Sequence, residues 1–262
     1  MGRKIVLTSG KGGVGKTTIT ANLGIALAML SKKIVLVDAD IGLNNLDVAM
    51  GVENKIVYDI GDAAENRCRL KQALIQDECF SSLYTLPSAK SIEPNKISSK
   101  VFSQITEELS QDFDYVLIDC PAGIEDGFHR AVSGASEALV VTTPHISAVR
   151  DADKVISLLS SYSIKKVSLI VNRLKGKLVK DGSMMDAKDI SQLLRTPLAG
   201  AIPDDDNINI NSQINKTKNM KDAAQLSYIL LAENLEGLHN RVYDCSYGYR
   251  GIINKIRNIF RG

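Results

Sequence analysis

The sequence predicts an α/β fold in which a mostly parallel sheet is sandwiched by helices. Short apolar segments rich in β-branched residues alternate with stretches of helical periodicity, and this alternation is typical of parallel strands joined by helical crossovers. Most of the segments are apolar throughout, as expected for strands that are covered on both faces. A glycine-rich loop directly follows the first of them. Ligands of such sheets bind at the carboxyl ends of the strands, so we expect the functional residues there.

Seven apolar segments are assigned as strands: residues 4–8, 33–37, 84–87, 115–119, 138–142, 166–171 and 198–202. Helical periodicity predicts helices at residues 17–30, 96–110, 148–161 and 220–239. Residues 176–183 are expected to form an exposed loop. We therefore expect one α/β domain over residues 1–243. A short hinge and a C-terminal amphipathic helix are expected over residues 244–262.

The composition is that of an ordinary globular protein, with 44% hydrophobic and 24% charged residues among 262. The four cysteines show no CxxC or metal-ligand spacing, and no secretory signal is evident, so we expect reduced thiols in the cytoplasm. Residues 250–262 hold four basic residues and no acid, and 32 − 4 leaves 28 basic against 30 acidic residues elsewhere. Nucleic acid is not an expected partner, because binding it needs a basic face.

The loop between the first strand and the first helix has the composition of a phosphate-binding loop. Its residues are Gly10, Lys11, Gly12, Gly13, Val14, Gly15, Lys16, Thr17 and Thr18. The glycines let consecutive N–H groups converge on phosphate oxygens, and the helix N-terminus adds its dipole. Lys16 then supplies a positive charge to the β- and γ-phosphates, and the Thr17 hydroxyl ligates Mg²⁺. The sequence thus predicts ATP and Mg²⁺ as cofactors; a glycine-rich turn without a ligand is the alternative.

Two acidic clusters follow predicted strands. Asp38 and Asp40 come at the end of the second strand, and Asp119 ends a segment in which apolar residues precede the acid. Carboxylates there can hold Mg²⁺ and orient an attacking water, since phosphoryl transfer depends mainly on positioning and charge stabilisation. We therefore expect Asp38 and Asp119 to join Thr17 at the metal. An acid at a strand end that merely caps the next helix is the alternative.

The last residues of the chain predict an amphipathic helix. At about 100° per residue, the apolar side chains of the segment cover an arc of roughly 120°; they are Ile252, Ile253, Ile256, Ile259 and Phe260. Lys255 and Arg257 flank this arc, where long side chains can reach lipid headgroups. The pattern is typical of a helix in a membrane interface with anionic lipid as its partner. A terminal helix docked on the protein body is the alternative.

Lys11 gives the loop a second lysine, and residues 11–18 resemble the deviant Walker A box of the MinD/ParA family. The early lysine of that family reaches across a dimer interface to the partner's nucleotide. The resemblance therefore implies a P-loop NTPase fold of the deviant Walker A type and a homodimer that forms on ATP binding. Residues 40–47 and 119–124 resemble the MinD branch of the family in particular.

The resemblance also implies roles for single residues. Weak Mg-dependent ATP hydrolysis would occur in the dimer, with Lys11 and Lys16 at the phosphates, Asp40 positioning the attacking water and Asn45 near the dimer contact. The adenine would be held by Asn172, Arg173, Pro203 and Asp204. Two positions depart from the family pattern. Asn44 stands where some relatives carry Arg, and His145 stands where many carry Glu, next to the expected effector surface.

The function that the resemblance implies is that of a membrane-associated ATPase that regulates placement of the cell-division site by recruiting a division inhibitor. Such a protein would be cytoplasmic and peripheral on the inner face of the cell membrane. A topological regulator that stimulates hydrolysis would be a further partner. The tail of residues 250–261 suits this function, because two tails in one dimer bind lipid more tightly than one.

Four alternatives stay open. A ParA-type DNA-partitioning ATPase predicts basic residues on the folded body, which is slightly acidic here. A flagellar-number regulator shares the fold, the dimer and a similar tail. A nitrogenase-reductase-like carrier needs two cysteines per subunit for a cluster, and only Cys120 lies near the expected nucleotide switch. A non-enzymatic scaffold would bind ATP without hydrolysing it.

Overall fold

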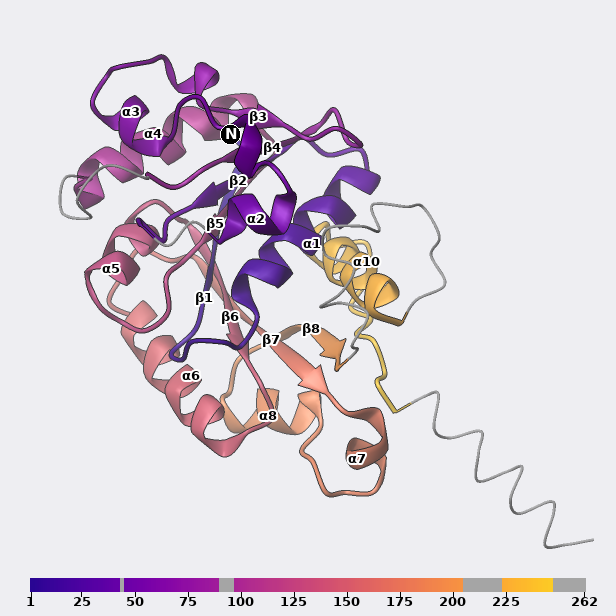
Figure 1. Ribbon diagram of the computed structural model, residues 1–262. Helices are drawn as coiled ribbons and strands as arrows, with labels where there is room; N and C mark the ends of the chain where they lie inside the picture. Colours follow the sequence, from indigo (N-terminus) through magenta and orange to yellow (C-terminus); the bar gives the residue numbers. More distant parts are fainter. Residues whose placement is uncertain (43–44, 90–96, 205–222, 247–262) are drawn as a thin grey trace, which may run out of the picture.

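In the part of the chain that the structure describes, residues 1–42, 45–89, 97–204 and 223–246, eight strands form one sheet between layers of helices in the computed structural model (Figure 1). The strands are β1 (Arg3–Thr8), β2 (Ile34–Asp38), β3 (Ile75–Gln76), β4 (Leu83–Leu86), β5 (Tyr115–Asp119), β6 (Glu137–Thr142), β7 (Lys166–Leu174) and β8 (Leu198–Pro203). Their order is β3-β4-β2-β5-β1-β6-β7-β8. All neighbours pair in parallel except β3 and β4. The predicted mostly parallel α/β fold is confirmed.

Both faces of the sheet are buried, which explains why the strands show no polar alternation. Every residue of β2 and of β5 is buried. Successive side chains of a strand point to opposite faces, so Val35 and Val37 pack into one apolar core while Ile34 and Leu36 pack into the other. The two cores hold the central strands in place, and with them the strand ends that carry the acidic residues.

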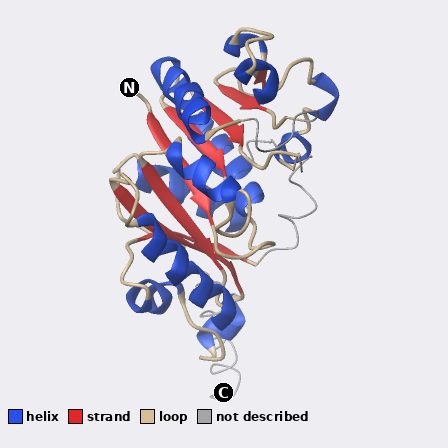
Figure 2. Cartoon of the chain, turned by 90° about the vertical axis from the view of Figure 1, so that its left-hand side faces the viewer, coloured by secondary structure: helices blue, strands red, loops and turns tan. Residues whose placement is uncertain are grey.

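Helices cover the two faces unequally (Figures 1 and 2). One face carries α1 (Lys16–Met29), α10 (Ala223–Leu235) and the short α2 (Leu46–Met50). The other carries α3 (Ile60–Ala64), α4 (Ser99–Asp112), α5 (Asp126–Ser133), α6 (Ile146–Leu159) and α8 (Ala187–Leu193). The remaining helical segments are α7 (Gly176–Lys180) and the 3₁₀ turns Glu53–Lys55 and Leu70–Gln72. The sandwich predicted from the sequence is therefore present.

The predicted strands agree with the structure to within a residue at their ends, except that β7 runs three residues further. One prediction is wrong: residues 176–183, expected to form a loop, contain the helix α7. Gly176 is buried and Val179 packs against the core, so tertiary contacts stabilise a helix too short to show a period. The short elements α2, α3, α5, α8 and β3 were not predicted, for the same reason.

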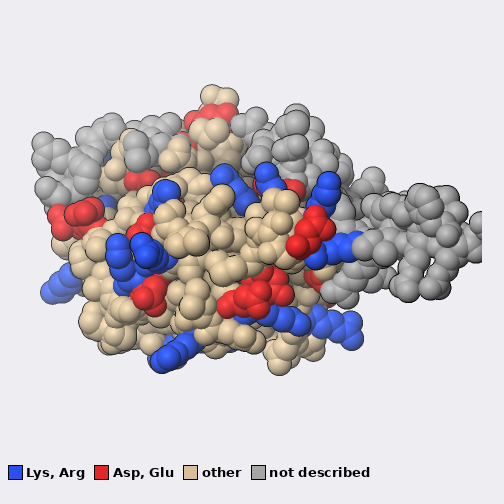
Figure 3. All heavy atoms as spheres, turned by 90° about the horizontal axis from the view of Figure 1, so that it is seen from below, with Lys and Arg blue, Asp and Glu red and all other residues tan. Residues whose placement is uncertain are grey.

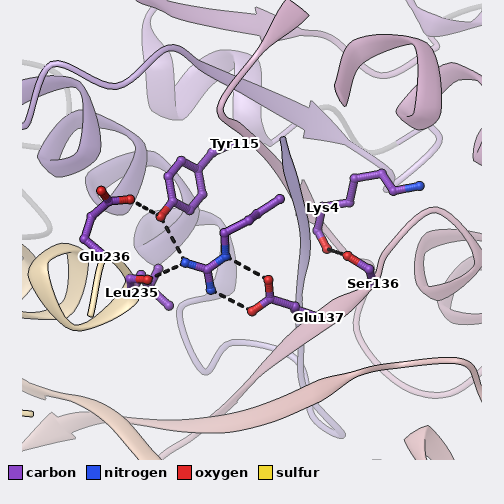
Figure 4. A network of polar contacts seen from close by, with 7 residues as sticks. Lys4, Tyr115, Ser136, Glu137, Leu235 and Glu236 are labelled. Carbon is purple, nitrogen blue, oxygen red and sulfur yellow. Dashed lines mark hydrogen bonds and ion pairs between the residues drawn. The ribbon is translucent and has the colours of Figure 1, made fainter. Parts of the chain in front are cut away.

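A polar network joins the amino-terminal ends of the central strands to the end of α10 (Figure 4). Arg3 donates to both carboxylate oxygens of Glu137, at 2.8 and 2.6 Å, and to the Tyr115 hydroxyl at 3.0 Å. It also contacts the Leu235 carbonyl oxygen, and the Tyr115 hydroxyl donates to Glu236. Burial raises the pKa of Tyr115, so its hydroxyl keeps its proton for that bond. The network anchors α10 to the sheet on the edge opposite the glycine-rich loop.

No helix within the described ranges is long and apolar enough to cross a bilayer. The apolar and basic tail residues, 252–260, lie outside the described residues, and of the segment 244–262 only Asp244, Cys245 and Ser246 are described. The amphipathic helix and the domain boundary at residue 243 therefore stay predictions.

Candidate nucleotide site

Residues 9–15 connect β1 to α1 at the carboxyl edge of the sheet. Gly13 and Gly15 have φ values of +75° and +96°, a left-handed conformation that favours glycine. Gly15 immediately precedes α1, so the amino end of this helix, with its partial positive charge, faces the loop. The backbone thus has the form of an anion-binding turn.

Two neighbouring elements, α6 and β7, pack against the loop so closely that the contacting loop residues must be glycine. A Cβ on Gly10 would lie 2.4 Å from the carbonyl oxygen of Asp151 in α6, and one on Gly15 would lie 2.5 Å from Asn172 Nδ2 in β7. The Asn172 amide donates to the Val14 carbonyl oxygen at 2.8 Å. The loop is therefore held in shape by β7 and α6 and not only by its own residues.

The two lysines of the loop have different surroundings. Lys16 is 8% exposed, and its ammonium donates to Ser9 Oγ at 2.9 Å. Ser9 Oγ donates in turn to the Lys11 carbonyl oxygen at 2.8 Å, which directs Lys16 along the inside of the loop. Lys11, in contrast, is exposed.

Asp119, at the end of β5, faces the first turn of α1. Its Oδ2 accepts from the Thr17 hydroxyl at 2.6 Å, and its Oδ1 accepts from Thr20 at 3.3 Å. Burial raises the pKa of Asp119 to about 6, although these hydrogen bonds and the charge of Lys16 oppose the shift. Sequence reasoning expected Asp119 and Thr17 at one metal; the structure brings them into direct contact, and it adds Thr20.

Asp38 lies directly beside Asp119, because β2 and β5 are neighbours and these two residues are in register. Its carboxylate accepts from the backbone N–H of Asp40 at 2.9 Å and of Leu46 at 3.3 Å. Burial, and then the negative charge of Asp119, raise the pKa of Asp38 to about 8. Two buried carboxylates side by side repel each other, so this part of the site favours a bound cation.

Asp40 is partly exposed and lies at the rim of the site. Burial raises its pKa, while the positive charges of Lys16 and Arg130 lower it. Arg130, on α5, is 6% exposed and has a pKa lowered by burial. Sequence reasoning missed Arg130, since an arginine in a short helix among polar residues carries no signal of burial.

The two segments expected at the adenine lie side by side at the ends of β7 and β8. Leu174 pairs with Pro203, and the Asp204 N–H donates to the Leu174 carbonyl oxygen at 3.0 Å. Asn172 is buried, whereas Arg173 is exposed and has a φ of +58°. The four residues thus line the same edge of the sheet as the loop.

Other residues from the sequence analysis lie further out. Asn45 is exposed directly before α2, next to Leu46, which donates to Asp38. His145 is exposed directly before α6. Asn44 lies outside the described residues.

The oxygen atoms of this site suit a magnesium ion that is also bound by phosphate oxygens and water. Among the described residues, no group of three or more His, Cys, Asp or Glu side chains forms a metal cage. Mg²⁺ binds through one or two protein oxygens, phosphate oxygens and water, and Thr17, Asp38 and Asp119 offer oxygens of this kind. Cys120, by contrast, is only 2% exposed, so its thiol does not face a second chain with which it could share a metal cluster.

A glycine-rich turn between β1 and α1, a buried lysine at its end and an aspartate facing the next threonine define a P-loop NTPase. The model of the ParA family described as NUBPL iron-transfer P-loop NTPase matches residues 1–235. The chain belongs to this class and, within it, to the MinD family of septum site-determining proteins.

Relatives and solved structures place the chain in that family over nearly its whole length. It is 46% identical to the septum site-determining protein MinD of Bacillus subtilis, over 99% of this chain and 98% of that protein. It resembles MinD in the MinC:MinD complex of Aquifex aeolicus, with a TM-score of 0.81, 43% identity, and 90% and 96% of the two chains covered. It also resembles MinD of Pyrococcus horikoshii in complex with Mg-ADP, with a TM-score of 0.81, 30% identity, and coverage of 91% and 97%.

Proposed function

We propose that this chain is an ATP-dependent, dimerising ATPase of the cell membrane that regulates placement of the division site by recruiting a division inhibitor. The contrast between two lysines of one loop supports this most. Lys16 is buried against Ser9, inside the loop, whereas Lys11 is exposed. An exposed lysine beside a nucleotide site is available to a second copy of the chain, as the family's dimer requires.

The loop residues would bind and orient the nucleotide. Backbone N–H groups of residues 10–18 and the amino end of α1 would hold the phosphates, with Lys16 as the fixed cation. Asn172, Arg173, Pro203 and Asp204 would hold the base. Thr17 and, directly or through water, Asp38 and Asp119 would hold Mg²⁺. The bound ion would supply positive charge at the β- and γ-phosphates.

Asp40 would orient the water that attacks the γ-phosphate. Its place at the rim, between the buried acids and solvent, leaves it within the fields of Lys16 and Arg130. These positive charges favour the ionised carboxylate, which is the form that accepts a proton from water. Hydrolysis would be weak, because the site needs Lys11 from a partner chain to be complete.

The C-terminal tail would attach this dimer to the membrane surface. One tail with five apolar side chains and a few basic ones binds lipid marginally, whereas two in a dimer bind with avidity. ATP would therefore place the protein on the inner face of the membrane, and hydrolysis would release it. The MinC:MinD complex of a relative supports a division inhibitor as the partner on the dimer.

Sedimentation with anionic vesicles tests this proposal. We expect the full chain to pellet with vesicles in Mg-ATP and to stay mostly in the supernatant in Mg-ADP. Equal binding in both nucleotides would mean that the tail is a constitutive anchor, and that ATP does not control localisation.

A further inference from the structure

The last described residues of the chain, 242–246, which we call the tail root, are packed against the body. With α7 and the start of α8 they enclose a cavity of about 150 Å³, to which Val179 and Ala187 contribute from the body. Ser246 is 8% exposed, and burial raises the pKa of Cys245 to about 12. The last described residues therefore lie beside α7 and α8 (Figure 1).

Hydrogen bonds hold the chain at and just before the tail root. Asn234, near the end of α10, donates to the carbonyl oxygens of Ala199 in β8 and of Arg241, at 2.9 and 2.7 Å. Asp244 accepts from the backbone and the hydroxyl of Ser246, at 2.9 and 2.6 Å. Asn234 thus joins Arg241, directly before the tail root, to β8, and the tail root forms a turn of its own beside α7 and α8.

The segment that forms α7 and α8 holds more basic than acidic residues, and one of the basic residues, Lys175, is paired with Asp204 at 3.6 Å. Residues 175–195, which we call the α7–α8 lobe, hold five basic residues and three acids, whereas residues 1–246 as a whole hold 28 basic and 30 acidic residues. Asp186 and Asp189 accept backbone N–H groups at the start of α8. Figure 3, seen from the side of α7 and α8, shows Lys and Arg side chains spread over this face with acidic ones between them.

The helix α7 has two sides with different roles. Val179 faces the tail root across the cavity. Lys177 is exposed, and Leu178 is 36% exposed, so a cation and an apolar side chain lie together at the surface. Such a pair suits the boundary between headgroups and acyl chains of a bilayer, where an apolar group inserts and a lysine stays at the headgroups.

We propose that the α7–α8 lobe is a second contact with anionic lipid, which orients the body on the membrane. The proposal rests on the proposed function, since it needs the tail to bring the body to the bilayer. Five residues separate the tail root from Ile252, and the six Cα–Cα steps between Ser246 and Ile252 span at most about 22 Å when fully extended. A lysine near an anionic bilayer raises partition onto it about fivefold, within a Debye length of about 8–10 Å.

Charge reversal on α7, in the full chain, tests the lobe. We compare Lys177→Glu/Lys180→Glu with Lys165→Glu/Lys166→Glu, which makes the same charge change at two exposed lysines at the start of β7, on the opposite edge of the sheet. Vesicles of phosphatidylglycerol and phosphatidylcholine in Mg-ATP are the probe. We expect the α7 variant to partition at least tenfold less than wild type, and the control variant to match wild type within about twofold.

The possible outcomes separate the lobe from the proposed function. Wild-type binding with no difference between the variants would overturn the lobe contact and leave the proposed function intact. Equal loss in both variants, or loss of ATP-dependent dimers by the α7 variant without lipid, would also overturn it. A wild-type chain that does not bind vesicles would overturn the proposed function as well.

A tryptophan reporter gives a second measurement that is independent of affinity. The chain contains no tryptophan, so Leu178→Trp introduces a single indole at the surface of α7. We expect its emission to shift to shorter wavelength with anionic vesicles and Mg-ATP. Val57→Trp is the control, because Val57 is 79% exposed and lies outside the lobe, and its emission should stay constant. Unchanged emission of Trp at position 178 on bound protein would contradict the contact.

Discussion

Lys11 and Lys16 belong to one short loop, and their exposure separates their roles. Lys16→Ala removes the buried cation that lies inside the loop, so we expect Kd for ATP to rise about thirtyfold or more, the equivalent of about 2 kcal/mol. Lys11→Ala should keep ATP binding within about threefold and lose the dimer and hydrolysis. Calorimetry with ATP and gel filtration measure the two effects; normal ATP-induced dimers in Lys11→Ala would refute the role in trans.

Asp40 differs from Asp38 and Asp119 because it is partly exposed, and because its carboxylate accepts no hydrogen bond from another described residue. Asp40→Ala should therefore leave Mg-ATP binding intact and slow hydrolysis about 100-fold, the usual contribution of a general base. The variant should accumulate as a dimer in ATP. A strictly monomeric variant with ATP bound would show that Asp40 has another role.

Asp38 makes the metal-free protein sensitive to pH. Its folded pKa of about 8 lies above the unfolded value of about 4, so the folded state loses stability as pH rises from 4 and this loss is complete above 8. Asp38→Asn removes the buried charge. In EDTA we expect its melting temperature to exceed that of wild type by several degrees at pH 8 and to approach it at about pH 4. A difference independent of pH would mean that ionisation of the buried Asp38 carboxyl is not the cause.

At the scale of elements, both β7 and α6 pack against the glycine-rich loop. A Cβ on Gly10 would lie 2.4 Å from the Asp151 backbone oxygen in α6, so glycine at this position lets α6 approach the loop. Thus the helix that begins directly after His145, at the expected effector surface, touches the phosphate loop directly.

The C-terminal tail is the element that we expect to be separable from the body. Deleting residues 249–262 should leave a folded protein that binds ATP and dimerises, because the core is formed by residues 5–235, and it should abolish vesicle binding. Ile256→Glu should weaken vesicle binding nearly as much, since it places a charge in the apolar arc. Melting curves, gel filtration and vesicle sedimentation test this; a deletion variant that still binds vesicles in ATP would disprove the assignment.

At the scale of the whole molecule, the Arg3 network joins β1, β5, β6 and α10. Arg3→Met keeps much of the apolar stem but leaves Glu137, whose side chain is only 17% exposed, without its bidentate cation. We expect the free energy of unfolding to fall by about 2 kcal/mol, measured by urea denaturation. Lys71→Met is the control, because Lys71 pairs with Asp112 at the surface, and it should change stability by less than about 0.5 kcal/mol.

Most residues of the nucleotide site could be predicted from patterns of neighbouring residues in the sequence, but not all of them could. The glycine spacing, the position of Lys16 after the loop and the acids at strand ends could be predicted, since each depends on residues adjacent in the chain. Arg130 could not, because its place near Asp40 depends on how α5 packs. The helix α7 was missed because five residues are too few to show a helical period.

The sequence by itself determined the class of fold, the phosphate loop and the acidic strand ends, and it predicts the apolar arc of the tail. The tertiary structure decided which of these residues meet. Thr17 contacts Asp119 across 102 residues, Asn172 holds Val14 across 158, and Arg3 pairs with Glu137 across 134. The order of the strands creates these contacts, and strand order depends on packing among distant segments, which a pattern of neighbouring residues does not encode.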